Sequence, residues 1–248
     1  MKPIILLSND DGITAPGLKS LYDELIDLGE LWVAAPETAQ SAQGRAITLT
    51  RPLRVVELSE RWFMVDGTPS DCVNLAINTL LPRSPDLVIS GINLGPNLAD
   101  DISYSGTVAA AFEAAIKAIP ACAVSLATRS NANYGPAARF TARLARNLLS
   151  NGLPTDTLLN INVPAQVQRE PLSYRLTSQG KSIYEKKITR VQDPRSQTYY
   201  WIGGKEVDFE KIDGSDAAAV AAGHVSITPL STNLTNSAVL NELQNLVL

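Results

Sequence analysis

The chain has 248 residues, of which 45% are hydrophobic and 19% are charged, and its net charge is −4. This composition is ordinary for a globular protein and excludes extensive disorder. The negative charge and the lack of a basic run exclude binding of duplex nucleic acid through bulk electrostatic attraction, although a local site can still hold a small anion.

The cysteines and the N-terminal residues argue against a secreted or membrane protein. Cys72 and Cys122 lie in apolar segments without Cys-x-x-Cys spacing, which favours buried reduced thiols over a disulfide or a metal pair. The apolar run of residues 4–7 is too short for a signal peptide or a membrane span. We therefore expect a cytoplasmic protein with no membrane partner.

The first elements predict a β-α-β unit. Residues 4–7 are a continuous apolar run, typical of a buried parallel strand, and they end in the polar turn of residues 8–12. Residues 16–28 carry leucines at a helical period behind a proline. Residues 31–35 then predict a second strand, and such units are almost always right-handed.

The same alternation continues along the next hundred residues. We expect strands at 47–65, 86–90 (running into 91–93), 121–125 and 158–161, and helices at 70–80 with a Ser70 cap, 106–119 and about 134–149. Strands alternating with helices over residues 1–165 predict an α/β fold with a Rossmann-like, doubly wound, mostly parallel sheet.

The pattern changes after residue 164. Residues 172–188 and 198–202 predict extended, hairpin-forming segments joined by the polar turn 193–196. A short helix at 216–222, a strand at 225–228 and an amphipathic helix at 236–246 follow. A hairpin and a terminal helix have little core of their own. We therefore expect residues 166–248 to form an extension that packs on the core or on a partner subunit.

Two polar loops are predicted to converge at one edge of the sheet. Ligands of open α/β sheets bind outside the carboxyl ends of the strands, where the strand order reverses. In the usual winding, strands 4–7 and 86–90 are neighbours there, and their loops carry Asp10, Asp11 and Asn93. A third loop, residues 37–44, follows the second strand.

This convergence predicts a divalent metal. The adjacent carboxylates Asp10 and Asp11 repel each other unless a cation neutralises them. With the amide oxygen of Asn93 they are hard oxygen ligands, suited to Mg²⁺ or Mn²⁺. A lone Asp-Asp-Gly more often forms a solvated turn, but the Asn93 loop favours the metal. Asp100 and Asp101 are further candidates, although a loop or cap role is favoured for them.

Residues 104–107 open the helix 106–119 and predict an anion cradle. Free N–H groups, a partial positive charge and the hydroxyls of Ser105 and Thr107 gather there. A simple helix cap, with Gly106 for close packing, is the alternative. A metal beside such a cradle indicates phosphoryl chemistry, in which the metal polarises a phosphoryl oxygen and lowers the pKa of a bound water.

Several motifs together resemble one family. The segments are 6–12 (LLSNDDG), 15–17 (APG), 65–69 (VDGTP), 90–97 (SGINLGPN), 104–111 (YSGTVAAA), 200–203 (YWIG), 215–216 (SD) and 225–230 (VSITPL). In content and order they resemble the SurE family of nucleotidases, from the first strand to about residue 230. The set is far more specific than any single motif.

The resemblance implies an activity and a set of site residues. It implies hydrolysis of nucleoside 5′- and 3′-monophosphates with one divalent metal ion, short polyphosphate being a further substrate in some members. It also implies an extension exchanged between subunits of a homodimer, sometimes a tetramer. The family's metal ligands fall on Asp10, Asp11, Ser41 and Asn93, and its phosphate-contacting positions on Asn97, Ser105, Gly106 and Thr107. Spacing alone does not indicate Ser41.

One loop departs from the family pattern. Residues 37–46 lack the family's upstream basic residue, and Arg45 stands where a neutral or titratable side chain is common. The departure bears on substrate preference and metal affinity. Asp10 and Asp11 are the candidate catalytic residues: an attacking water is bound to the metal or activated by one of them, or Asp10 itself attacks the phosphorus.

Other functions remain alternatives on the sequence alone. One is a non-catalytic nucleotide- or metal-binding regulatory module, which the lack of Gly-x-Gly-x-x-Gly weakens for dinucleotides. A phosphoryl-transfer enzyme of the aspartyl-phosphate type is a second alternative, but such enzymes carry Asp-x-Asp after the first strand and this sequence has Asp-Asp-Gly. For His224, a packed or interfacial position is favoured over a general acid. For Trp201 with Tyr199 and Tyr200, a subunit contact is favoured over base stacking.

Overall fold

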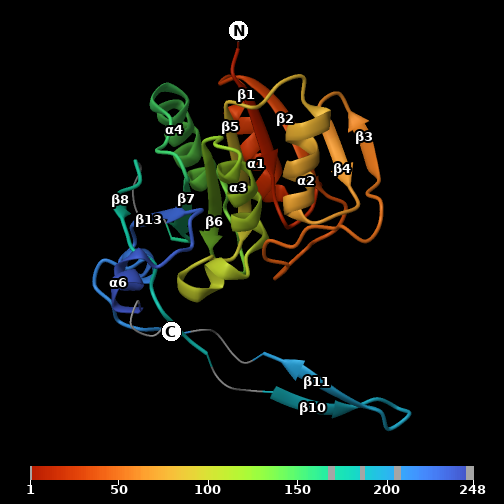
Figure 1. Cartoon of the computed structure of the whole chain (residues 1–248), viewed down its shortest axis with the longest axis vertical. Helices are drawn as coiled ribbons and strands as arrows, with labels where there is room; N and C mark the ends of the chain where they lie inside the picture. Colours follow the sequence, from red (N-terminus) through yellow and green to blue (C-terminus); the bar gives the residue numbers. More distant parts are fainter. Residues whose placement is uncertain (1, 167–170, 185–187, 204–207, 244–248) are drawn as a thin grey trace.

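The computed structural model describes residues 2–166, 171–184, 188–203 and 208–243, and its main body is one twisted sheet with helices on both faces (Figure 1). The strands are β1 (Ile4–Ser8), β2 (Glu30–Pro36), β3 (Val55–Ser59), β4 (Trp62–Val65), β5 (Leu87–Leu94), β6 (Ala121–Ala127), β7 (Thr157–Pro164), β8 (Tyr174–Leu176), β9 (Ser182–Ile183), β10 (Ile188–Gln192), β11 (Thr198–Ile202), β12 (Asp208–Phe209) and β13 (Val225–Ser231). The α-helices are α1 (Pro16–Leu25), α2 (Pro69–Leu75), α3 (Gly106–Ile116), α4 (Gly135–Asn151), α5 (Asp216–Ala221) and α6 (Leu240–Leu243).

The strand order confirms the predicted fold class. The sheet runs β3-β4-β2-β1-β5-β6-β7-β13-β8. Its six central strands, β4 to β7 in that order, are all parallel, which is the doubly wound arrangement. The order reverses between β1 and β5, where Ser8 lies opposite Ser90. The predicted neighbours are therefore adjacent, and the carboxyl ends of both strands meet at one edge.

The alternation of side chains along the strands gives the sheet two hydrophobic cores. Ile5 and Leu7 of β1 pack with residues of α1 and α4. Ile4 and Leu6 face the other way and pack with residues of α2 and α3. A strand covered on both faces has to be apolar at every position, which is why β1 reads as an unbroken hydrophobic run. Packing on both faces holds the central strands, and with them the sheet edge that carries the candidate site, in a fixed position.

The cap predicted for the helix at residues 70–80 is wrong. Thr68, not Ser70, is the N-cap: its hydroxyl accepts the N–H of Asp71 (3.1 Å), and the Asp71 carboxylate accepts the N–H of Thr68 (2.9 Å). This reciprocal pair satisfies two free donors of the first turn. The helix also changes type, since α2 ends at Leu75 and a π-helical turn spans Ala76–Leu80.

Two predicted extended segments are divided in the structure. The strand expected over residues 47–65 is the antiparallel pair β3–β4, which turns through Arg61 at φ 65°, and residues 47–54 are a loop. Residues 172–188 contribute β8 to the main sheet and β9, which pairs with β12. The turn between β3 and β4 contains neither Gly nor Pro and leaves a weak signal, whereas Pro52 and Gly180 do mark the other two breaks, and the prediction did not use them.

The extension belongs partly to the sheet and partly stands apart. β13 pairs antiparallel with β7 and parallel with β8, whereas β10 and β11 form a hairpin around the predicted turn and extend away from the body (Figure 1). The second hairpin strand was predicted correctly, but the first, β10, covers Ile188–Gln192 and not residues 172–188. The final helix is described as a 3-10 turn at Ser237–Val239 and α6, and residues 244–246 of that prediction lie outside the described residues. The division of the chain at residue 165 stays a prediction. None of the described helices has the length and apolarity that crossing a membrane requires.

Candidate active site

An open cavity of about 350 Å³ lies at the carboxyl ends of β1 and β5. It is lined by all four predicted metal ligands, Asp10, Asp11, Ser41 and Asn93. The β1 loop, the loop after β2 and the end of β5 supply these residues, so three segments far apart in the sequence meet here. The remaining lining residues are Ala42, Leu94, Gly95, Pro96, Asn97, Asp101, Tyr104, Ser105 and Arg129.

Asp10 is held by the first turn of α3. The Thr107 hydroxyl donates to Oδ1 of Asp10, and the carbonyl of Asp10 accepts the N–H of Gln40 at 2.8 Å. Gly106 lets the helix come this close, because a Cβ there would lie 2.8 Å from Cβ of Asp10. Asp10 is only 7% exposed. The carboxylate is therefore fixed before any ligand binds.

Asp11 and Asn93 are positioned by the end of β5. Oδ2 of Asp11 accepts the N–H of Leu94 at 3.0 Å. Nδ2 of Asn93 donates to the carbonyl of Gly95 at 2.8 Å, which leaves its Oδ1 as the free acceptor of the amide. These contacts place carboxylate and amide oxygens on the two sides of the point where the strand order reverses.

The turn after β1 depends on a glycine. Gly12 has φ +102°, a conformation that side-chain-bearing residues rarely adopt. Its carbonyl accepts a hydrogen bond from Nδ2 of the buried Asn9 at 2.9 Å. The sharp turn makes the two consecutive aspartates face the cavity together.

The electrostatics of the two aspartates fit a bound cation. Burial raises the pKa of Asp10 to about 6, with the charge of Asp11 adding to the rise and the Thr107 hydrogen bond opposing it. Burial also raises the pKa of Asp11, against the Leu94 hydrogen bond. A divalent ion would stabilise both charged forms. No described cluster contains three or more His, Cys, Asp or Glu side chains fit for a metal, so the donors here are two carboxylates plus neutral oxygens, the set that Mg²⁺ and Mn²⁺ accept.

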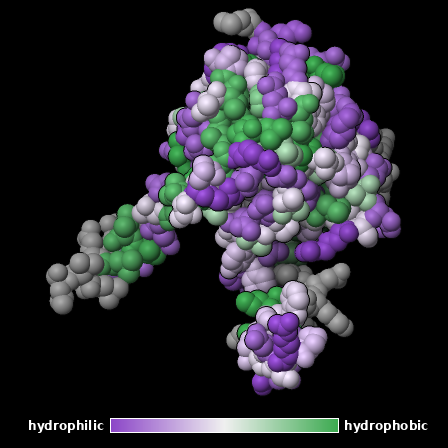
Figure 2. All heavy atoms as spheres, turned by 90° about the vertical axis from the view of Figure 1, so that its right-hand side faces the viewer, coloured by the Kyte–Doolittle hydropathy of each residue, from purple (hydrophilic) through white to green (hydrophobic). Residues whose placement is uncertain are grey.

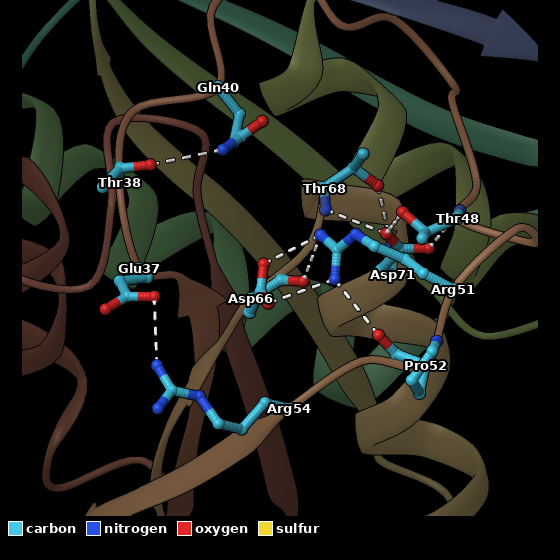
Figure 3. A network of polar contacts seen from close by, with 10 residues as sticks. All are labelled: Glu37, Thr38, Gln40, Thr48, Arg51, Pro52, Arg54, Asp66, Thr68 and Asp71. Atoms are coloured by element: carbon cyan, nitrogen blue, oxygen red, sulfur yellow. Dashed lines mark hydrogen bonds and ion pairs between the residues drawn. The ribbon is translucent and has the colours of Figure 1, made fainter.

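A polar network anchors the loop that carries Ser41 (Figure 3). The buried Asp71 carboxylate accepts the N–H of Thr48 at 2.9 Å and its hydroxyl at 2.7 Å. The Thr68 hydroxyl donates to the carbonyl of Ala46 at 2.7 Å. In the same network Arg51 donates three hydrogen bonds to Asp66, two to its carboxylate and one to its carbonyl. The 65–69 motif thus acts as a support for the loop and does not itself line the cavity.

We expect Asp71→Ala to destabilise the protein by about 2–4 kcal/mol, because it removes a helix cap and leaves buried donors unpaired. Asp71→Asn keeps one acceptor oxygen and should cost less. Thermal or urea unfolding measures both. Equal stability of wild type and Asp71→Ala would contradict the anchoring role.

The four predicted phosphate-contacting residues do not all face the cavity. Asn97 and Ser105 line it. The Ser105 hydroxyl also caps α3 by accepting the N–H of Val108 at 3.1 Å. Thr107 is fully buried and its hydroxyl is engaged with Asp10, while Gly106 packs against Asp10. The structure therefore gives Thr107 and Gly106 a part in positioning Asp10.

Gly106→Ala tests that close packing. The added methyl group would press on Cβ of Asp10 and on Pro69, and a displacement near 1 Å at a reacting centre can lower rates about 100-fold. We expect the phosphatase kcat/KM to fall about 10- to 100-fold with the fold retained by circular dichroism. Full activity in this variant would contradict the tight Gly106–Asp10 contact.

Sequence reasoning missed Arg129 and favoured a loop or cap role for Asp101 over a place in the site. Both line the cavity, and the Asp101 carboxylate accepts the hydroxyl of Tyr184 at 2.8 Å. Asp100 instead faces the extension, where it binds Lys181 and the N–H of Ser182. Arg129 follows β6 at the same sheet edge, so the strand-end rule that selected Asn93 would have found it had it been applied to β6.

Other residues considered from the sequence lie away from the cavity. His224 does not line it, and its Nδ1 is 2.8 Å from the Ser173 hydroxyl. Tyr199, Tyr200 and Trp201 lie on β11 of the separate hairpin. Cys72 and Cys122 are buried free thiols, as predicted.

Comparison with known proteins shows the family of this chain. The family profile described as "Survival protein SurE" matches residues 5–186. The chain belongs to the SurE family. A Geobacter sulfurreducens protein named 5′-nucleotidase SurE is 52% identical over 97% of this chain and 92% of its own length. One of the same name from Myxococcus xanthus is 50% identical over 96% of this chain and 91% of its own length.

A solved SurE structure shows the same fold. The crystal structure of the SurE protein from Aquifex aeolicus superimposes with a TM-score of 0.86 and 38% identity, covering 98% of this chain and 99% of that one. The similarity therefore includes the extension as well as the α/β core.

Proposed function

We propose that this SurE-family chain is a metal-dependent 5′-nucleotidase, a phosphoric monoester hydrolase that converts nucleoside monophosphates to nucleoside and phosphate. The observation that carries the proposal is the cavity in which a buried carboxylate, Asp10, and a half-buried one, Asp11, meet Asn93, Ser41 and the start of α3. The curated relatives named 5′-nucleotidase SurE support the same reaction. Nucleoside 3′-monophosphates and short polyphosphate are further candidate substrates.

The residues of the cavity would divide the work. Asp10, Asp11, Ser41 and Asn93 would hold one divalent ion, Mg²⁺ or Mn²⁺. When bound, that ion supplies Lewis-acid polarisation of the phosphoryl group and lowers the pKa of a water. Asp10, kept in place by Thr107, is the carboxylate best placed to orient or deprotonate the attacking water.

The phosphoryl oxygens need donors that are fixed in advance. The N-terminal end of α3 offers N–H groups and a partial positive charge next to Ser105. Asn97 is fixed by its own contacts, its backbone N–H donating to Oδ1 of Asn162 and its side chain to Ser125. Arg129 adds a positive side chain to a cavity that otherwise carries carboxylates. Such donors stabilise the charge that develops on the phosphoryl group.

Phosphate release tests the proposed function. The substrates are nucleoside 5′- and 3′-monophosphates, polyphosphate and p-nitrophenyl phosphate, each with Mn²⁺, Mg²⁺ or EDTA. We expect release that requires metal and is fastest with nucleoside 5′-monophosphates. No release from any substrate by folded, metal-loaded protein would contradict the enzymatic function and leave a regulatory binding module as the remaining candidate.

Self-association is part of the same proposal. Within the described residues the β10–β11 hairpin pairs with no other strand, and its apolar side chains are exposed, Trp201 at 69% and Ile202 at 90%. An isolated two-stranded hairpin is marginal in water. We propose that the hairpin packs on a second copy to form a homodimer, with a tetramer as a larger form. A cytoplasmic location remains the prediction made from the sequence.

A further inference from the structure

A second cavity, of about 250 Å³, adjoins the candidate active site. Ser105 lines both cavities, so they meet at the start of α3. Its walls come from α3, from the loop that carries Arg45 and from the extension, which contributes Gln179, Leu230 and Leu234. Apart from Ser105, none of the residues proposed to bind the metal or the phosphate lines this second cavity.

The two cavities differ in chemistry. The active-site cavity is lined by carboxylates, amides and hydroxyls, whereas the second has apolar walls that include Phe112, Leu230 and Leu234. A few polar groups in an otherwise apolar cavity are typical of a site for a flat organic group. A nucleotide has the same two parts, a charged phosphate and a flat base, joined by a sugar that could pass Ser105.

Arg45 is arranged to stack. Its guanidinium lies over the ring of Phe112, 4.3 Å from the ring centroid. The backbone on either side is tied down, because the N–H of Gly44 donates to the carbonyl of Tyr104 at 2.9 Å and the carbonyl of Ala46 accepts the Thr68 hydroxyl. A guanidinium plane stacks on aromatic rings and presents only donors. With one face of its guanidinium on Phe112, Arg45 can direct the N–H groups of its edge to the acceptors of a base that lies in the same plane.

Gln179 supplies the complementary group. Its Nε2 donates to the carbonyl of Ala99 at 3.0 Å, which leaves its amide oxygen as an acceptor. Guanine and hypoxanthine present the acceptors O6 and N7 together with an N1–H donor, whereas adenine presents an amino donor at the position of O6. Arginine donors beside a glutamine acceptor match the 6-oxopurines and oppose adenine.

We propose that this second cavity binds the base of the substrate and that Arg45 makes 6-oxopurine nucleotides preferred. The proposal rests on the proposed nucleotidase function and adds the substrate class to it. It also gives a role to Arg45, which lines this cavity and not the candidate active site.

Kinetics with paired substrates test the proposal. The wild type should hydrolyse GMP and IMP with kcat/KM about tenfold above that of AMP, the discrimination typical of one well-formed arginine contact. In Arg45→Ala, the ratio of kcat/KM for GMP to that for ribose 5-phosphate, which has no base, should fall about tenfold. Both substrates meet the same protein sample, so a loss of folded protein cancels in the ratio.

Arg83→Ala is the matched control, since Arg83 pairs with Asp86 at the opposite ends of the strands. It should leave the ratio unchanged. Arg45→Lys keeps the positive charge but loses the planar guanidinium, so its ratio of kcat/KM for GMP to that for ribose 5-phosphate should lie between those of wild type and Arg45→Ala. An unchanged GMP to ribose 5-phosphate ratio in Arg45→Ala would overturn the proposal.

A binding measurement separates this proposal from the proposed function. If no substrate is hydrolysed, calorimetric titration of guanosine into the protein still reports on the cavity. We expect the Kd of guanosine to rise about tenfold in Arg45→Ala and not in Arg83→Ala. Equal Kd values in wild type and Arg45→Ala would exclude the base site whether or not the protein is an enzyme.

Discussion

Replacing Asp10 by asparagine should lower kcat/KM for nucleoside monophosphates about 1,000-fold, since a bound metal supplies several kcal/mol of transition-state stabilisation and this change removes a charged ligand. In the proposed function Asp10 also orients or deprotonates the attacking water. Asp23→Asn is the control, because Asp23 is exposed and pairs with Lys19 on α1. Activity of Asp10→Asn within tenfold of wild type would contradict the assignment.

The same substitution should stabilise the metal-free protein. Burial raises the pKa of Asp10 from 3.8 to about 6, so the folded state binds a proton more tightly than the unfolded state does. This contribution to stability is complete below pH 3.8 and is lost as the pH rises through about 6. The rise in pKa corresponds to about 3 kcal/mol, and a neutral asparagine should recover about 1–3 kcal/mol of it at pH 7.5.

Unfolding in EDTA at pH 7.5 and pH 4 measures this effect. Asp10→Asn should unfold at a higher temperature than wild type at pH 7.5, and the difference should shrink at pH 4. Added Mn²⁺ should stabilise the wild type and leave Asp10→Asn almost unchanged. A destabilised Asp10→Asn in EDTA would mean that Asp10 has a structural role in the turn after β1.

Changes in the β10–β11 hairpin should have a large effect on the oligomeric state. Trp201→Asp combined with Ile202→Asp should convert a dimer into a monomer in sedimentation experiments. Consecutive strand residues point to opposite faces, so the double change places a charge on each face of β11. Trp201 lies opposite Thr189, and Ile202 opposite Ile188. Apolar side chains on both faces of the hairpin favour a contact in which a second copy buries both faces. A charge buried there without a partner costs several kcal/mol of association free energy.

The hairpin tip supplies the control. In Figure 2, which looks toward the tip, hydrophilic residues lie at the end of the projection and hydrophobic ones beside them. Ser196→Asp adds a charge in the exposed turn and should leave the assembly intact. A wild type that sediments as a monomer at all concentrations, or a double variant that still dimerises, would exclude the hairpin as the subunit contact.

Most of the sheet and half of the site could be predicted because they depend on local patterns. Alternating apolar strands and helices predict a doubly wound sheet, and in the usual winding of such sheets the loops of Asp10, Asp11 and Asn93 meet. Ser41 could not be placed this way. Its loop has no regular structure, and long-range bonds such as those between Asp71 and Thr48 hold it in position.

The predicted role of Thr107 shows the same limit. The start of α3 was recognisable, but whether a hydroxyl faces a substrate or a neighbouring side chain depends on how closely the helix packs on β1. Gly106 allows a very close approach, so the Thr107 hydroxyl reaches Asp10. The polar turn and the aromatic strand of the hairpin, in contrast, were predicted in place, because both signals are local, although the first hairpin strand was not.

The location of a bound metal tests most directly whether the cavity at the ends of β1 and β5 is the metal site. Crystals soaked in Mn²⁺ and measured above the manganese absorption edge should show an anomalous peak between Asp10, Asp11, Ser41 and Asn93, and the peak should be absent from Asp10→Asn. A manganese peak elsewhere in the wild type, with none at this cavity, would contradict the account.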